Sequence, residues 1–305
     1  MIEKIGNVDL NLLYYCGKDL YSDGDIEDEI LGFVKKSPQE AYDQYIQKRK
    51  KWAVLYHLSP IRQNIVSSLA IDKTHNVLEI GAGCGAVTGR LCEMAQEVTC
   101  IELSKKRSLI NAYRNKHFNN LEIMVGNFET IEENLNKSYD YITLIGVYEY
   151  AASYISTDNP YHDFIKIAMK HLKPGGKLVI AIENRLGIKY FAGCKEDHVG
   201  LHFEGIEGYT NTKGVRTFSR EELITIFRDC GYGDIRFLYP YPDYKFPISI
   251  YTDDRLPLKG ELNMNIMNMD QTRQLLFDEA KMLDSIADTS LFSVFSNSFL
   301  IEITK

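Results

Sequence analysis

Two short motifs have the residue types and spacing of a nucleoside-binding site. Residues 77–85 read Val-Leu-Glu-Ile-Gly-Ala-Gly-Cys-Gly, an apolar segment that runs into a glycine-rich turn. Glu102 ends the next apolar segment, residues 98–102, seventeen positions beyond that turn. Glycines allow a tight turn and a close approach of the backbone to a ligand, and a carboxylate at a strand tip accepts hydrogen bonds from both ribose hydroxyls. The two motifs therefore predict a site for a nucleoside cofactor.

The turn alone leaves two classes of cofactor open. Gly81, Gly83 and Ala86 satisfy the dinucleotide pattern G-x-G-x-x-G/A, so a nicotinamide or flavin cofactor is one alternative. Glu79 argues against it, because its charge would repel a pyrophosphate seated at a helix N-terminus. The same charge suits S-adenosylmethionine, which carries an ammonium and a sulfonium and no phosphate. A structural carboxylate that accepts bonds from local amides is the other interpretation of Glu79.

From the glycine turn onward, over about residues 60–186, the chain resembles the class I methyltransferases that use S-adenosyl-L-methionine. The resemblance implies that Glu102, next to Leu103, binds the ribose and that Asn127 and Phe128 contact the adenine. Gly146 and Tyr148 are then expected near the methionine end, and the product is S-adenosyl-L-homocysteine. The residues implied for the turn itself are Glu79, Gly81, Ala82, Gly83 and Gly85.

Two flanking segments are similar to a narrower bacterial subgroup of this family. They are Tyr-His-Leu-Ser-Pro-Ile-Arg at residues 56–62 and Glu-Asn-Arg-Leu-Gly-Ile-Lys-Tyr-Phe-Ala-Gly at 183–193, followed by Glu196-Asp197-His198. The subgroup occurs in lanthipeptide-type maturation of ribosomal peptides and in surface-glycan clusters. The resemblance implies O-methylation of a peptide's C-terminal carboxylate. Methylation of a sugar hydroxyl or another small molecule is the alternative, and a NAD-dependent oxidoreductase is a more distant one.

The acceptor side must either remove a proton or orient a carboxylate. Methyl transfer from a sulfonium is an in-line displacement in which positioning supplies most of the rate. A hydroxyl acceptor also loses a proton, for which His198, His202 and Glu183 are candidate bases. A carboxylate acceptor needs cations such as Arg185. We predict His198, His202 and Arg185 as catalytic residues and Tyr150, Asn184, Lys189, Arg216 and Tyr244 as acceptor contacts.

A metal site is the other interpretation of the two histidines. His198 and His202 are four positions apart, as metal-binding histidines on one helix are. Gly200 between them disfavours a regular helix, and a third ligand is not evident. We therefore predict no metal.

Apolar segments and amphipathic segments alternate along the chain and predict an α/β fold. Strands are expected at residues 76–80, 98–102, 121–125, 140–145, 177–182, 234–238 and 298–303, with helices at 61–70, 86–94, 104–116, 161–171 and 219–230. Such alternation is typical of a Rossmann-like, doubly wound sheet, here of seven strands, six parallel and the last antiparallel. Ligands bind at the carboxyl ends of its strands, where the glycine turn, Glu102, Asn127 and Tyr148 fall.

The remaining segments are expected to flank this sheet. Residues 1–58 would form an N-terminal helical cap, with a helix that starts at Ser37-Pro38 and a capping box completed by Glu40. Residues 59–305 would form the methyltransferase domain. Insertions on the acceptor side are expected at about 183–217 and 239–292, the latter with a helix at 271–286.

Composition limits the partners and the compartment. The net charge of −7 and a pI of about 5.6 disfavour broad capture of nucleic acid through its phosphates. No apolar run reaches the roughly 18 residues of a membrane span, and Met1-Ile-Glu-Lys-Ile lacks the features of a signal peptide. The six cysteines form no C-x-x-C pair, which fits free thiols in a reducing cytoplasm. We expect a peptide, glycan or small-molecule acceptor, no nucleic acid and no membrane partner; the oligomeric state is not predicted.

Overall fold

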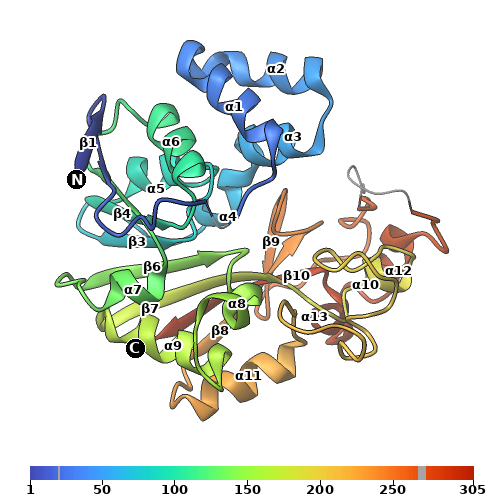
Figure 1. Cartoon of the computed structure of the whole chain (residues 1–305). Coiled ribbons are helices and arrows are strands. Elements are labelled where there is room, and N and C mark those ends of the chain that lie inside the picture. Colours follow the sequence, from blue (N-terminus) through green and yellow to red (C-terminus); the bar gives the residue numbers. More distant parts are fainter. Residues whose placement is uncertain (20, 267–272) are drawn as a thin grey trace. The chain divides into compact units, whose positions relative to one another are not determined.

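The computed structural model describes residues 1–19, 21–266 and 273–305 (Figure 1). The chain divides into two compact units. The first unit consists of Met1–Ile145 and Ile167–Leu178, and the second of Gly146–Lys166 and Val179–Lys305. One strand, β7 (Leu172–Glu183), contributes residues to both.

The first unit is built on a set of parallel strands. They are β2 (Val8–Asn11), β5 (Leu121–Val125), β4 (Glu97–Glu102), β3 (Asn76–Ile80) and β6 (Tyr139–Ile145), each paired in parallel with the next. The central members are almost wholly buried, as continuous apolar runs in a parallel sheet must be. β3 and β5 begin and end at the predicted residues. A further strand, β1 (Ile2–Ile5), pairs antiparallel with β2.

The N-terminal segment is partly extended rather than helical throughout. Residues 1–11 form β1 and β2, and Ser37 ends α1 (Asp25–Lys36) instead of starting a helix. The predicted capping box at Ser37 is therefore wrong, because no side chain caps the 3-10 turn that begins after Pro38. Lys50 has a left-handed backbone, with φ of 49°, and divides the predicted long helix into α2 (Tyr42–Arg49) and α3 (Trp52–Leu58).

These N-terminal helices share a core with the glycine turn. Ile30 and Val34 of α1, Tyr42, Val54 and Leu58 pack with Cys84 of the turn and Ile110. Figure 1 shows α1, α2 and α3 together, beside the rest of the first unit. The other helical segments of the unit are η1 (Gln39–Ala41), η2 (Pro60–Gln63), α4 (Asn64–Ser67), α5 (Thr88–Met94), α6 (Lys105–Arg114) and α7 (Phe128–Glu132). Tyr42 of α2 thus packs into the core of the first unit.

The second unit contains the remaining strands and the acceptor-side segments. Its strands are the end of β7, β10 (Ser298–Thr304), β8 (Ile235–Tyr241) and β9 (Ser249–Thr252), where β8 pairs antiparallel with both β10 and β9. Its helical segments are η3 (Tyr148–Tyr150), α8 (Ala151–Tyr154), α10 (Ile188–Phe191), α11 (Arg220–Asp229), α12 (Glu279–Ser285) and α13 (Leu291–Phe295), and α9 (Pro160–Lys170) runs from this unit into the first. The predicted capping box at Ser219 and Glu222 is confirmed at the start of α11.

The α/β, Rossmann-like architecture is confirmed, but the predicted number of strands is wrong. The strand order is β1-β2-β5-β4-β3-β6-β7-β10-β8-β9, a mixed sheet of ten strands rather than seven. The additional strands are β1, β2 and β9, each only four residues long. Of the helix predicted at 271–286, residues 271 and 272 lie outside the described residues, and α12 covers Glu279–Ser285. Within the described parts of the chain, no helix is long and apolar enough to cross a bilayer.

Candidate functional site

The glycine turn after β3 has the backbone that its sequence requires. Gly81, Gly83 and Gly85 have φ values of 73°, 54° and 72°, in the left-handed region that favours glycine. A Cβ on Gly85 would lie 2.3 Å from Asn111 Oδ1, so this glycine permits a close approach of α6. A Cβ on Gly83 would meet no atom within 4 Å. Gly83 therefore borders open space, as a backbone that receives a ligand must. Ala82 is buried beside it.

Glu102 is tied to this turn through the backbone. Its Oε2 accepts a hydrogen bond of 2.7 Å from Gly83 N–H, and its Oε1 accepts one of 2.8 Å from Ser104 N–H. Each carboxylate oxygen can accept more than one bond, so both oxygens retain capacity for a ribose hydroxyl. Burial raises the pKa of Glu102, although Arg107 and the two N–H groups oppose that shift. Leu103, next to it, is half-buried.

Glu79 is wholly enclosed and has partners inside the first unit. Its Oε2 accepts from the Thr88 hydroxyl at 2.6 Å and from the Cys100 thiol at 3.2 Å. Burial raises the pKa of Glu79 to about 7. A cationic ligand would favour its charged form, whereas an anionic one would not. This environment is compatible with both interpretations of Glu79, a structural carboxylate and a partner for a positively charged cofactor.

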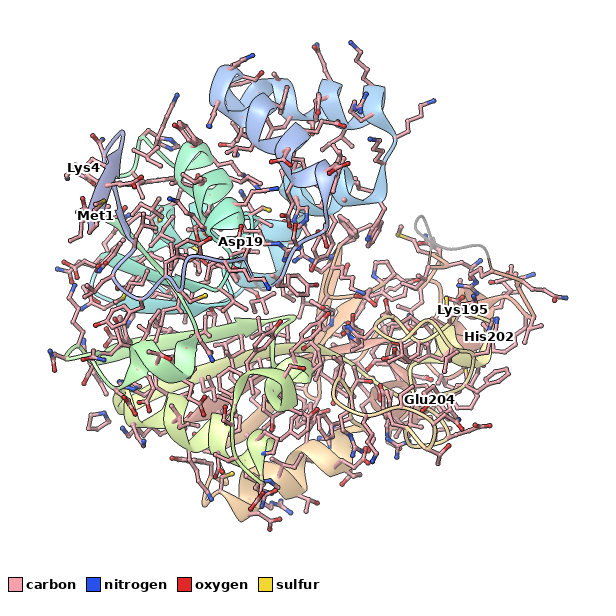
Figure 2. All side chains as sticks on the ribbon, viewed as in Figure 1. Met1, Lys4, Asp19, Lys195, His202 and Glu204 are labelled. Atoms are coloured by element: carbon pink, nitrogen blue, oxygen red, sulfur yellow. The ribbon has the colours of Figure 1, made fainter. Side chains whose placement is uncertain are left out.

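The predicted adenine-side residues begin a helix, and an N-terminal segment lies beside them. Asn127 is the N-cap of α7, and Phe128 is buried. A Cβ on Gly126 would lie 2.7 Å from the carbonyl oxygen of Tyr14. Asp19, labelled in Figure 2, accepts a hydrogen bond of 2.7 Å from Lys105 N–H at the start of α6. Residues of the segment after β2 thus lie next to the ends of β4 and β5, which the sequence did not predict.

A comparison with protein families identifies the segment that carries these motifs. Residues 78–178 match the family model described as a methyltransferase domain. This segment is similar to methyltransferase domains. S-adenosyl-L-methionine is therefore the cofactor, as the sequence predicted, and the nicotinamide alternative is not favoured. The match covers the turn from Leu78 onward, Glu102 and the strands β4, β5 and β6.

Curated relatives are similar over a limited part of the chain. One is the ribosomal RNA small subunit methyltransferase A of Borreliella afzelii, 32% identical over 119 residues, which are 39% of this chain and 42% of that protein. Another is the enzyme of the same name from Streptococcus mutans, 42% identical over 64 residues, 21% of this chain and 22% of that protein. The chain thus spans less than half the length of these relatives.

Two solved structures are similar at low identity. One is a methyltransferase from Thermotoga maritima described as a possible histamine N-methyltransferase, with 16% identity, a TM-score of 0.45, and coverage of 88% of this chain and 99% of that one. The other is phosphoethanolamine N-methyltransferase 1 of Haemonchus contortus bound to phosphoethanolamine and S-adenosylhomocysteine. It has 15% identity and a TM-score of 0.46, and the likeness covers 93% of this chain and 50% of that one.

The residues that follow β6 belong to the second unit. Gly146 has a φ of 69°, and a Cβ there would lie 2.7 Å from the hydroxyl of Tyr244. Tyr148 is fully buried, its hydroxyl donates to the carbonyl of Tyr161 at 3.0 Å, and its ring lies among those of other aromatic side chains. Tyr148 therefore exposes no surface to a ligand in this structure.

His198 is held in a buried polar cluster. Its Nε2 lies 3.3 Å from Glu183 Oε2, and its Nδ1 lies 3.0 Å from the Tyr150 hydroxyl. Its backbone N–H donates to Glu196 at 2.7 Å, which fixes the turn that presents the ring. Glu149 completes the cluster: one oxygen of each of its two glutamates and one ring nitrogen of His198 all lie within 4.8 Å of one another. The predicted residues His198 and Tyr150 are thus brought together.

Two lysines form ion pairs with carboxylates in and next to this cluster. Lys245 Nζ lies 2.7 Å from Glu183 Oε1 and 2.5 Å from Asp197 Oδ1. Lys189 Nζ lies 3.0 Å from Asp197 and 2.8 Å from Asp243. Although burial alone would raise the pKa of Glu183, Lys245 and His198 hold it well below its usual range. Because Lys245 already neutralises Glu183, the cluster has the chemistry of an ion-paired proton carrier rather than of a metal site.

The other predicted acceptor residues have partners within the second unit. Arg185 donates to Glu222 at 2.7 Å and to the carbonyl of Gly205 at 3.1 Å. The amide of Asn184 is fully buried and engaged by backbone groups on both sides. Arg216 lies 3.7 Å from Glu222 and over the ring of Phe218.

His202 is separate from His198. It is exposed and forms a backbone bridge with Lys195, beside which it is labelled in Figure 2. The structure does not bring it into the cluster of Glu149, Glu183 and His198.

Glu149 is the member of the site that the sequence did not predict. It lies between two tyrosines in the segment after β6, and its neighbours Tyr148 and Tyr150 were both named. The available signal was a carboxylate directly after the strand where the methionine end of the cofactor is expected. The aromatic side chains of that segment, and not its carboxylate, were predicted as contacts.

Proposed function

We propose that this protein transfers the methyl group of S-adenosyl-L-methionine to a hydroxyl oxygen of its acceptor. The observation that carries the proposal is the buried cluster of Glu149, Glu183, His198 and Tyr150 in the second unit. A hydroxyl is a poor nucleophile until its proton is removed, and a positioned base contributes about 10²- to 10⁴-fold to such a step. The cluster offers carboxylate groups for that proton.

The cations that would orient a carboxylate acceptor support such an acceptor less well than a hydroxyl. Arg185 and Lys189 both form short ion pairs with protein carboxylates, at 2.7 Å with Glu222 and 2.8 Å with Asp243. A second anion would have to displace those partners, and breaking the buried pair of Lys189 and Asp243 costs about 3–5 kcal/mol. A neutral acceptor leaves the balance of charges intact. We therefore infer a hydroxyl-bearing acceptor, such as a sugar of a glycan or another small molecule.

One observation favours O-methylation of a peptide's C-terminal carboxylate as a second candidate. Arg216 has a buried Nε that finds no hydrogen-bond partner among residues 1–19, 21–266 and 273–305. A guanidinium recognises a carboxylate with two parallel hydrogen bonds, so this donor suits a carboxylate acceptor. The product would then be an ester rather than an ether.

The acceptor chemistry is tested with methyl-labelled S-adenosyl-L-methionine and three probes. They are alkyl glycosides, short peptides with a free C-terminal carboxylate, and small-subunit ribosomal RNA, which the names of the relatives suggest. We expect label on the glycosides that survives mild alkali, because an ether is stable there. Gly83→Arg is the control, since its side chain would fill the open space beside the turn. Label that alkali releases from the peptides, or label on RNA alone, would contradict the proposal.

A further inference from the structure

We infer that Glu149, and not His198, takes the proton from the acceptor hydroxyl, while His198 positions the site. The inference rests on the proposed function and adds the residue that performs its proton transfer. It starts from a feature that the fold does not explain. Glu149 is 1% exposed, and its Oε2 has no hydrogen-bond partner in the described parts of the chain.

An unsatisfied buried carboxylate oxygen is costly. Leaving a buried polar group without a partner costs about 1–3 kcal/mol, and more when it is charged. The backbone around Glu149 is nevertheless held firmly: its carbonyl accepts from the Tyr161 hydroxyl and from Arg216 N–H, each at 3.2 Å. The backbone at Glu149 is therefore held in place, and one oxygen of its buried side chain is left without a partner. Such an arrangement is expected where the missing partner is a substrate group.

The position of Glu149 in the chain agrees with this role. It is the fourth residue after Ile145, which ends β6, and it follows Gly146 and Tyr148, the residues predicted at the methionine end of the cofactor. The segment after this strand is therefore where the sequence predicts methyl transfer.

His198 is less suited to accept the proton, because both of its ring nitrogens are engaged. Nε2 contacts Glu183 at 3.3 Å and Nδ1 contacts the Tyr150 hydroxyl at 3.0 Å. Burial alone would lower the pKa of His198, but Glu183 outweighs it and raises this pKa to about 9, with Glu149 and Glu196 adding to the shift. At neutral pH the ring is an imidazolium with no free lone pair.

Glu149, in contrast to His198, is suited to accept the proton. Burial raises its pKa to about 8, and Glu183 adds to that shift, whereas His198 and Lys245 oppose it. These are the charged groups that face it, from β7, from the turn at Glu196 and from the segment after β8. A carboxylate with this pKa is a much stronger base than an ordinary glutamate, and it matches the pH at which proton transfer is needed.

The step balances as a single displacement. The acceptor oxygen forms a bond to the methyl carbon while the carbon–sulfur bond breaks and its electron pair returns to sulfur. The hydroxyl proton moves to Glu149 Oε2, and the products are an ether and neutral S-adenosyl-L-homocysteine. Glu149 then releases its proton to solvent before the next turnover.

Glu149→Gln is the first test, with Glu207→Gln, an exposed glutamate of the same unit, as its matched control. We expect E149Q to lower the single-turnover rate by about 10²- to 10⁴-fold. Its affinity for S-adenosyl-L-homocysteine and its Tm should not fall, because a neutral amide removes a buried ionisable group. E207Q should match the wild type in all three. A rate within threefold of the wild type would overturn the inference, as would a fall in Tm that accounts for the lost activity.

The pH profile separates Glu149 from His198. The wild-type rate should rise between about pH 6 and pH 9, with a midpoint near the pKa of Glu149. In His198→Gln the loss of a neighbouring cation should move that midpoint to higher pH and leave activity there. If H198Q is inactive at every pH while E149Q remains active, His198 is the base and the inference is wrong. If the product is an alkali-labile ester, the proposed function fails instead, so the two failures are distinguishable.

Discussion

Replacing Lys245 by methionine removes the cation between two carboxylates, the buried Glu183 at 2.7 Å and the half-buried Asp197 at 2.5 Å. At an effective dielectric constant of about 20, each contact provides about 6 to 7 kcal/mol of Coulomb energy. Desolvation of the buried ions offsets several kcal/mol for each ion. Lys189 still lies 3.0 Å from Asp197 and His198 still lies 3.3 Å from Glu183, but the cluster loses one positive charge. We therefore expect K245M to lower the free energy of unfolding by about 3–5 kcal/mol near pH 7.5.

The loss should depend on pH in a defined direction. Burial alone would raise the pKa values of Glu183 and Asp197, but the nearby cations hold both below the usual range. The resulting stability is fully present above the unfolded pKa values, near pH 4 to 4.5, and is lost as the pH falls through the folded ones. In K245M the folded pKa values rise, so these carboxyls take up protons closer to neutral pH. The difference from the wild type should therefore narrow as the pH falls from about 7.5 to 5.

Urea unfolding followed by circular dichroism at both pH values measures this difference. Lys213→Met, at an exposed lysine of the same unit, is the control and should change stability by less than about 0.5 kcal/mol. A loss below about 1 kcal/mol at pH 7.5, or an equal loss at both pH values, would refute the reasoning, because an uncompensated charge in this cluster predicts a larger loss that narrows at lower pH.

Three further changes test the cofactor site and one helix. Gly83→Arg should abolish binding of S-adenosyl-L-homocysteine in calorimetry while the circular dichroism spectrum stays native, since the space next to Gly83 is open and the left-handed φ of 54° costs only about 1–2 kcal/mol; retained affinity would contradict the site. Glu102→Gln should weaken that binding by about tenfold or more, through loss of a charged acceptor worth about 1.5–3 kcal/mol; unchanged affinity would exclude the ribose contact. Ser219→Ala should lower stability by about 0.5–2 kcal/mol through loss of the capping box, without changing affinity; an unchanged Tm would argue against the cap.

Local sequence was sufficient for the elements that local interactions determine. β3 and β5 have the predicted bounds because short apolar runs flanked by polar residues define buried parallel strands. The capping box of α11 was readable because Ser219 and Glu222 are three residues apart. β2 was not predicted, because it is a four-residue strand whose partner, β5, lies more than a hundred residues away in the chain. No local pattern reports a pairing of that kind.

Partners that are distant in the sequence also explain the errors among the predicted acceptor contacts. Arg185 and Lys189 were predicted to contact the acceptor because their charges appeared in a glycine- and aromatic-rich segment. Their carboxylate partners, Glu222 and Asp243, are 37 and 54 residues further along the chain. Glu149 was missed for a related reason, since its unpaired oxygen is a property of the folded environment. Which charges are neutralised and which are free can be read only once distant segments have been brought together.

The path of the chain between the two units constrains how this protein can be recombined with another. The backbone passes from one unit to the other after Ile145, after Lys166 and after Leu178. A chimaera that exchanges only the second unit with that of another protein therefore needs three junctions, one of them inside α9 and one inside β7. A single crossover at residue 145 would leave the first unit without Ile167–Leu178. New acceptor specificity is accordingly easier to reach by changes in the loops of the second unit than by exchange of a whole C-terminal half.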